Sequence, residues 1–217
     1  MKALAVFPTL AMLLVVVATA LPASADTVYD NGPINGTSDG WTINFGFAVS
    51  DTFTVSGGTS TINGLSFGTF GFPGDVLDSV EISITSSEFG GTTYFNQVVS
   101  TTQTNCYGNQ YGYLICTQNA SFNGPTLGNG TYWINLQNAM VNTGDPVYWD
   151  ENSGVGCQSP GCPSQASNNS VGTIPSESFT VLGTTSGGGG SVPEPGSLLL
   201  LMSGVIGTLG ILRRKLQ

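Results

Sequence analysis

The sequence contains no histidine, and its four basic residues occur only near the two ends, at Lys2 and at positions 213–215. Residues 26–192 therefore carry no cationic side chain, although they hold twelve of the thirteen acidic residues. A region of this charge repels phosphate groups, which excludes nucleic-acid and nucleotide binding. The lack of histidine and lysine there also excludes histidine-dependent catalytic triads, Schiff-base chemistry and zinc sites built on imidazole.

Residues 26–182 also lack any apolar stripe with a helical period. Apolar side chains recur there at every second position, which is the pattern of strands with one buried face. The chain has 217 residues, 40% of them hydrophobic, so it is long enough to bury a core. The clearest alternating sets are Trp41, Ile43, Phe45, Phe47 and Val49, continued by Phe53 and Val55; Val80, Ile82 and Ile84; Tyr132, Ile134 and Leu136; and Phe179 with Val181.

Glycine-, proline- and asparagine-rich turn sequences, such as Asn31-Gly32-Pro33 and Asn123-Gly124-Pro125, separate these candidate strands. About eight or nine short strands over residues 26–182 predict an all-β ectodomain. We expect two antiparallel sheets packed face to face, a β-sandwich of jelly-roll type. A parallel β-helix is the alternative, but it requires a fixed repeat, which the sequence does not show.

Residues 1–25 have the organisation of a secretory signal peptide. Lys2 supplies the positive region, residues 10–18 are continuously apolar, and Ala23-Ser24-Ala25 offers small side chains to a signal peptidase. An uncleaved membrane anchor is the alternative, but the apolar run is short and Pro22 breaks the chain just before the small residues. We expect cleavage after Ala25 and export of the remaining chain.

The other end combines a linker, a short motif, an apolar segment and a basic tail. Residues 183–192 are rich in glycine, serine and threonine and predict a flexible linker. After Pro193-Glu194-Pro195, residues 196–212 are predominantly apolar, and a helix of this length reaches roughly 25 Å, slightly less than a bilayer core. The basic residues at 213–215 would hold its end in the cytoplasm, so the pattern predicts a transmembrane helix.

This order of motif, helix and basic cluster resembles the PEP-CTERM sorting signal of surface proteins from Gram-negative bacteria. Tails of this kind are also described as an ice-binding protein C-terminal domain, but the threonines here form no regular ranks. The resemblance implies that an exosortase, a membrane-embedded cysteine transpeptidase, recognises Pro193, Glu194 and Pro195. It further implies release of the chain to the cell surface or the exopolysaccharide matrix. The two prolines suit this role because they keep the segment out of a helix.

Four cysteines in an exported chain suggest two disulfides. Cys106 and Cys116 flank a candidate hairpin, and Cys157 and Cys162 flank a tight loop, so we expect these two local pairings. A site of four thiolates around a metal is the alternative. The oxidising compartment and the lack of two closely spaced pairs disfavour it, and we expect no metal at the cysteines.

The segment around Tyr148, Trp149 and Asp150 places two large aromatic side chains beside acidic ones. An aromatic ring can stack on the C–H face of a sugar while carboxylates accept its hydroxyls, so these three residues are candidates for carbohydrate binding. The alternative is that Trp149 belongs to the core and the acids solvate a turn. The same acids could instead hold calcium, although their spacing differs from that of an EF-hand loop.

We find no catalytic residues in this sequence. Asp150 and Glu151 are adjacent, and neighbouring residues of a strand point to opposite faces, so they cannot flank one glycosidic bond. We therefore expect a non-enzymatic surface or matrix protein without a cofactor, with an exosortase and the membrane as partners. A carbohydrate-binding module for matrix polysaccharide is the second hypothesis, and a glycoside hydrolase built from distant acids is the third.

Overall fold

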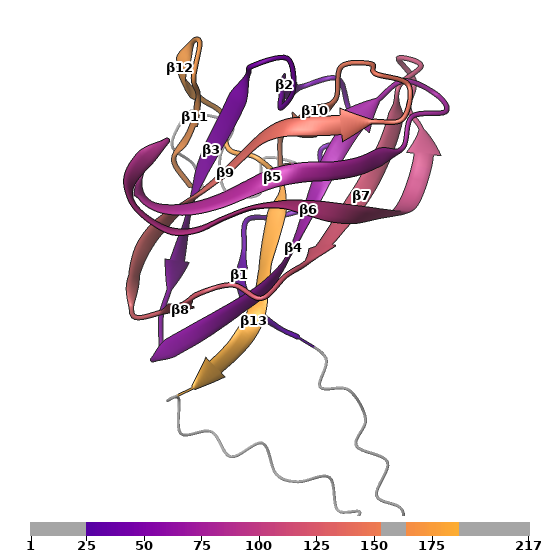
Figure 1. Ribbon diagram of the computed structural model, residues 1–217. Coiled ribbons are helices and arrows are strands. Elements are labelled where there is room, and N and C mark those ends of the chain that lie inside the picture. Colours follow the sequence, from indigo (N-terminus) through magenta and orange to yellow (C-terminus); the bar gives the residue numbers. More distant parts are fainter. Residues whose placement is uncertain (1–24, 153–163, 187–217) are drawn as a thin grey trace, which may run out of the picture.

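The structure, a computed structural model, describes residues 25–152 and 164–186. All regular elements of these residues are strands, which confirms the predicted all-β class (Figure 1). The thirteen strands are β1 (Asp26–Asp30), β2 (Gly40–Thr42), β3 (Ala48–Val55), β4 (Thr59–Gly71), β5 (Leu77–Ser87), β6 (Gly90–Gly108), β7 (Leu114–Ser121), β8 (Thr126–Leu127), β9 (Gly130–Val141), β10 (Tyr148–Asp150), β11 (Ala166–Asn168), β12 (Gly172–Ile174) and β13 (Phe179–Ser186).

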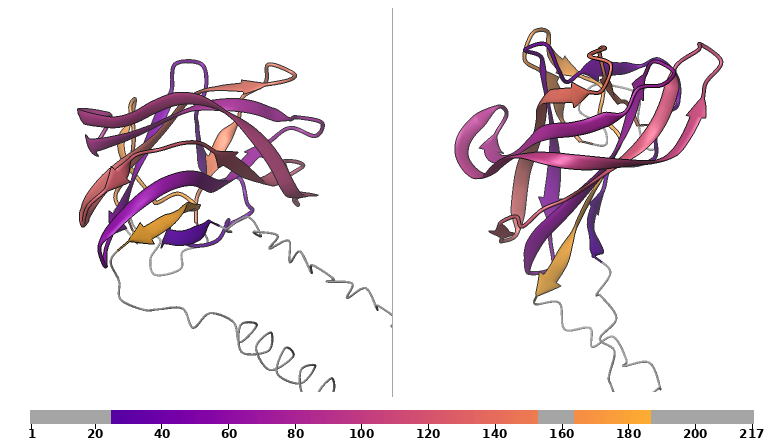
Figure 2. Two further views of the ribbon diagram at one scale, coloured as in Figure 1. Left: turned by 60° about the horizontal axis from the view of Figure 1, so that its bottom comes forward. Right: turned by 45° about the vertical axis from the view of Figure 1, so that its right-hand side comes forward.

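The strands pair antiparallel in one sheet that curls around its own inner face (Figure 2). The main path of hydrogen-bonded neighbours is β1-β13-β4-β7-β6-β5-β9-β3-β11-β12. The long strand β6 makes the turn of the sheet, because residues 90–100 pair with β5 and residues 101–108 pair with β7. The two sheets expected from the sequence are therefore continuous with each other through β6.

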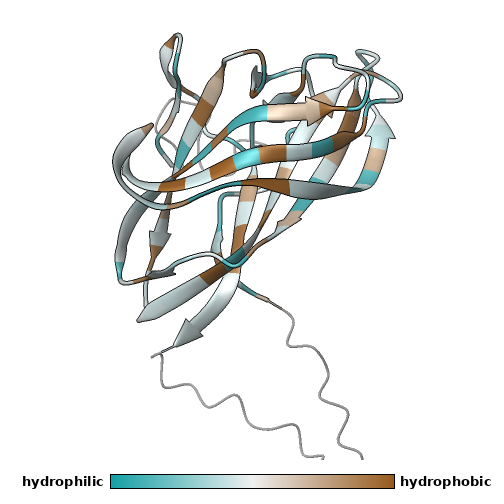
Figure 3. Ribbon diagram, viewed as in Figure 1, coloured by the Kyte–Doolittle hydropathy of each residue, from teal (hydrophilic) through white to brown (hydrophobic). Residues whose placement is uncertain are grey.

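The core lies between the two halves of this curled sheet. Alternating residues supply it, so apolar and polar bands follow one another along the strands (Figure 3). Trp149 is completely buried and its ring lies edge-on to Phe67 and Phe179, with centroids 6.2 and 5.6 Å away. Burial of such aromatic rings contributes the largest single areas of apolar surface to a fold of this kind.

The ends of the described domain lie side by side, because Asp26 of β1 pairs with Gly183 of β13. The first and last strands of the domain therefore meet at the same end of it. The predicted transmembrane helix, residues 196–212, lies outside the described residues. Within the described ranges, no helix is long and apolar enough to span a bilayer.

The disulfide between Cys106 and Cys116 confirms one of the two predicted pairings, with the two Cα atoms 4.2 Å apart. It joins β6 to β7 where their register shifts between Thr104 and Tyr107. Asn105, inside this shift, has a φ of 53°, which marks a bulge in β6. Cys157 and Cys162 lie outside the described residues.

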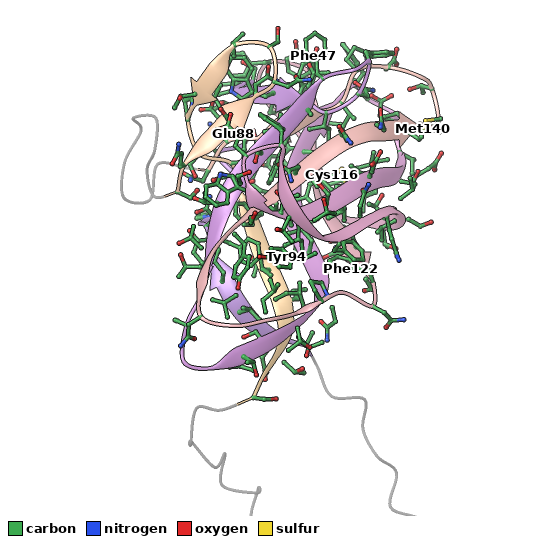
Figure 4. All side chains as sticks on the ribbon, turned by 60° about the vertical axis from the view of Figure 1, so that its left-hand side comes forward. Phe47, Glu88, Tyr94, Cys116, Phe122 and Met140 are labelled. Atoms are coloured by element: carbon green, nitrogen blue, oxygen red, sulfur yellow. A yellow bond between two sulfur atoms is a disulfide. The ribbon has the colours of Figure 1, made fainter. Side chains whose placement is uncertain are left out.

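The alternating run from Trp41 to Val49 is not one strand, contrary to the sequence-based expectation. Residues 44–47 form a turn between β2 and β3, closed by a 3.0 Å hydrogen bond from Phe47 N to Asn44 O. Both central residues, Phe45 and Gly46, have positive φ, of 57° and 85°. A turn whose two central residues both have positive φ normally takes asparagine and glycine at these positions. Phe45 is consequently 65% exposed, and Phe47 lies at the end of the molecule away from the start of β1 (Figure 4).

We expect the substitution Phe45→Asn to stabilise the protein, because asparagine tolerates the left-handed backbone that Phe45 adopts here. The expected gain is about 1 kcal/mol in the free energy of unfolding, measured by urea denaturation. Phe47→Asn is the matched control, since Phe47 is not among the residues with positive φ and should gain nothing. If Phe45→Asn and Phe47→Asn change the free energy of unfolding by the same amount, this explanation is refuted.

Candidate functional site

Three carboxylic acids lie in the interior of the domain, and each has no exposed surface: Asp51, Asp150 and Glu177. Asp51 belongs to β3, Asp150 ends β10, and Glu177 precedes β13. The backbone brings the last two together, because Ser178 N donates to Asp150 O at 2.9 Å and an isolated bridge joins Glu151 to Glu177. Residues 26–192 contain no cationic side chain, so neutral groups alone can compensate these acids.

Asp51 is compensated by hydrogen-bond donors from four segments of the chain. Its Oδ1 accepts from Thr52 N at 2.7 Å and from the hydroxyl of Ser164. Its Oδ2 accepts from Glu177 N at 2.8 Å, Ser176 Oγ at 3.2 Å and Asn31 Nδ2 at 3.3 Å. A buried carboxylate that receives several donors is stable without a salt bridge.

Asp150 and Glu177 are much less well compensated. Asp150 Oδ2 accepts from Gly36 N at 3.0 Å, but its Oδ1 has no hydrogen-bond partner among the described residues. Both carboxyl oxygens of Glu177 likewise have no hydrogen-bond partner among the described residues. Burying a charged carboxylate under these conditions is strongly unfavourable, which favours the protonated acid.

Burial accordingly raises the pKa of all three acids. Desolvation raises the pKa of Asp51 to about 6, although its hydrogen bonds act in the opposite direction. Desolvation also raises the pKa of Asp150 to about 7, with the negative charges of Glu151 and Asp39 adding to the effect. The pKa of Glu177 is raised well above its ordinary value by desolvation and then by the neighbouring charges of Asp51, Glu151 and Asp150.

The three residues suggested for carbohydrate binding do not form an exposed platform. Trp149 and Asp150 have no exposed surface, and Trp149 Nε1 donates to Ser178 O at 2.9 Å. The ring of Tyr148 stacks on Phe70, with centroids 4.6 Å apart and planes at 8°. The structure therefore agrees with the alternative reading of Trp149 as a core residue, and a sugar cannot reach its ring.

Among the described residues, no three histidine, cysteine or acidic side chains are arranged to hold a metal ion. The donors around Asp51 are N–H and O–H groups, which occupy the lone pairs that a cation would need. The carboxylate of Asp51 thus has the surroundings of a structural group.

An open groove of about 330 Å³ lies on the outer face of the sheet, over β4, β7 and β13. Pro33 and Ile34 form one wall, and Asn105 and Tyr107 of β6 form the other. Its floor is made of short side chains, including Ser66, Gly68, Thr117 and Thr180. Tyr107 is 50% exposed, so part of its ring is available to a ligand.

Sequence reasoning did not single out Tyr107 or the floor of this groove. In the sequence, the serine, threonine and glycine residues of β4 and β7 look like ordinary solvated strand positions. Only the pairing of β4 with β7 places them side by side. One signal was present: Tyr107 directly follows Cys106, whose disulfide fixes the backbone at that point.

The comparison with known protein families gave one match. Residues 191–215 match the family model described as the PEP-CTERM protein-sorting motif. The recognition residues Pro193, Glu194 and Pro195 fall within this match and outside the described residues. The motif implies export, sorting to the cell surface and an exosortase as processing partner. A comparison with curated protein sequences gave no match.

The raised pKa values predict that the protein is less stable in mild alkali than in mild acid. In the unfolded chain Asp51 and Asp150 release their protons near pH 4, whereas in the folded chain they keep them to about pH 6 and 7. The folded state thus binds more protons in this window, so its stability is full below pH 4 and decreases as the pH rises through 7. We expect the free energy of unfolding to fall by about 4 kcal/mol between pH 5 and pH 8.

Asp150→Asn should reduce this pH dependence, because asparagine cannot release a proton in the interior. Urea denaturation at several pH values gives the slope for the wild-type protein and the variant. Asp78→Asn, which removes an exposed acid of β5, is the control for the loss of one negative charge. Equal slopes for wild type and Asp150→Asn would show that Asp150 titrates as an ordinary surface acid.

Proposed function

We propose that this chain is a non-enzymatic protein of the cell surface or extracellular matrix, whose C-terminal signal is cleaved by an exosortase. The observation that carries the proposal is the sorting motif at residues 191–215. In this proposal residues 196–212 form a transmembrane helix, which holds the chain at the membrane until the enzyme acts at Pro193 to Pro195. The linker at 183–192 keeps the cleavage site clear of the folded domain.

Three properties of the described domain support a role outside the cell. Cys106 and Cys116 form a disulfide, which persists in oxidising compartments. The strands form a sheet that encloses its own core, as in β-sandwich ectodomains, and solvated positions carry serine and threonine in place of charges. The buried carboxylate of Asp51 is enclosed by neutral hydrogen-bond donors, which suits a structural group. Together these features suit a durable exposed domain better than an enzyme.

The common end for both termini fits this arrangement. Asp26 and Gly183 are paired, so the tail leaves the domain beside its N-terminal strand. A domain tethered in this way keeps its opposite end, where Phe47 lies, away from the attachment point (Figure 4). This supports a function in which the domain contacts other material at the surface.

The test replaces Pro193, Glu194 and Pro195 together by alanine in the full chain, expressed in a host that contains an exosortase. We expect wild-type protein to lose its tail and appear in the surface or released fraction. The variant should stay in the membrane fraction with its tail intact, since the recognised residues are gone. Intact-mass analysis and cell fractionation measure both outcomes.

Asp78→Asn serves here as a control, because it changes one acid in the folded domain and leaves the motif unaltered. It should be processed like the wild type. Identical processing of the alanine variant, or an intact tail on wild-type protein in the presence of the enzyme, would contradict the sorting role.

A further inference from the structure

We propose that the groove between Pro33–Ile34 and Tyr107 binds a segment of a neutral polysaccharide. This site is distinct from Tyr148, Trp149 and Asp150, and it deepens the matrix role proposed above by naming a ligand class. The proposal rests on the position of Tyr107, on the polar floor of the groove and on the charge of the domain.

Tyr107 is held in place by its backbone and by its neighbours. The bulge at Asn105 shifts the register of β6 against β7, which changes the direction of the following side chains. The disulfide of Cys106 fixes the strand directly before Tyr107. Bulges that redirect a side chain beside a groove are common at binding sites.

The ring of Tyr107 also has a defined position at its far end. A side chain at Gly36 would collide with the hydroxyl of Tyr107, so the ring reaches the loop that forms the opposite wall. Asn109 joins the same two segments, since its Nδ2 donates to Thr37 O at 2.6 Å and Gly36 O at 3.3 Å. A half-exposed ring fixed in this way loses little conformational entropy when a ligand stacks on it.

The floor of the groove offers hydroxyl groups to a ligand. Ser66 pairs with Thr180 of β13, so two polar side chains lie next to each other in the floor. Gly68 pairs with Thr117 of β7. The hydroxyls of Ser66 and Thr117 make no hydrogen bond to other described residues. Hydroxyls both donate and accept, which matches the hydroxyl groups of a sugar chain.

Charge decides which polysaccharide fits. The groove is lined by uncharged side chains, and the nearest acid at its edge is Asp30, which accepts weakly from Thr180 Oγ1 at 3.4 Å. No cationic side chain occurs in residues 26–192, so nothing in the domain attracts a polyanion. Uronic-acid and sulfated polysaccharides are therefore repelled, whereas neutral glycans are not. The open shape of the groove suits an internal segment of a long chain.

The test is affinity electrophoresis of the purified full chain in gels that contain dextran, mixed-linkage β-glucan or galactomannan, with alginate as the anionic polysaccharide. We expect retardation by at least one neutral polysaccharide and none by alginate. Tyr107→Ala should weaken the binding by at least about tenfold, because it removes the stacking surface. Thr117→Val keeps the shape and strand preference of the side chain, and loss of its hydroxyl should weaken binding severalfold.

Tyr111→Ala is the matched control, since Tyr111 is 57% exposed in the turn after β6 but does not line the groove. It should bind like the wild type. Absence of retardation by all three neutral polysaccharides, retardation by alginate, or equal effects of Tyr107→Ala and Tyr111→Ala would overturn the proposal. The assay contains no exosortase, so its outcome is independent of the sorting experiment.

Discussion

The structure depends on the burial of carboxylic acids in a domain that has no cation to neutralise them. Most folded proteins pair a buried acid with arginine or lysine, or do not bury it at all. Here the interior holds Asp51, Asp150 and Glu177 with no exposed surface. The fold must either surround such an acid with donors or keep it protonated. Asp51 shows the first solution, and Asp150 and Glu177 show the second.

The first solution also organises the chain. The donors to Asp51 come from the end of β1, from the segment before β11 and from the segment before β13. These segments are far apart in sequence, and the carboxylate of β3 connects them at one point. The position of Glu177 against Asp150 then follows, because Glu177 N is bound to Asp51 while Ser178 N is bound to Asp150 O. A single acid thus links both ends of the sheet path.

Much of the fold follows from the two-residue period of the sequence. Val80, Ile82 and Ile84 are buried in β5, as their alternation predicts. The disulfide between Cys106 and Cys116 was predicted from their positions on either side of a candidate hairpin. The period alone did not show which apolar positions end in turns, so Phe45 and Phe47 were expected to be inside. It also did not distinguish a core tryptophan from a ligand-binding one, because Trp149 occupies a strand position in either case. Whether Trp149 is buried depends on which other strands pack against β10, and these strands are distant from it in the sequence.

The buried acids had a signal in the sequence that can now be recognised. Asp51 shares the parity of Val49, Phe53 and Val55, and it therefore points to the same side as these core residues. Glu177 has the parity of Phe179 and Val181. An acid at such a position points into the core. Because the domain has no cationic side chain to pair with it, its carboxyl must either be protonated or accept hydrogen bonds from neutral donors. The groove gave no comparable signal, because its floor is assembled from three strands, β4, β7 and β13.

The most direct test of this account is a ¹³C NMR titration of the carboxyl groups of Asp51, Asp150 and Glu177. The account predicts midpoints of about 6 for Asp51 and about 7 for Asp150, with the midpoint of Glu177 well above that of an ordinary glutamate. Midpoints near 4 for all three, the value of exposed acids, would contradict it.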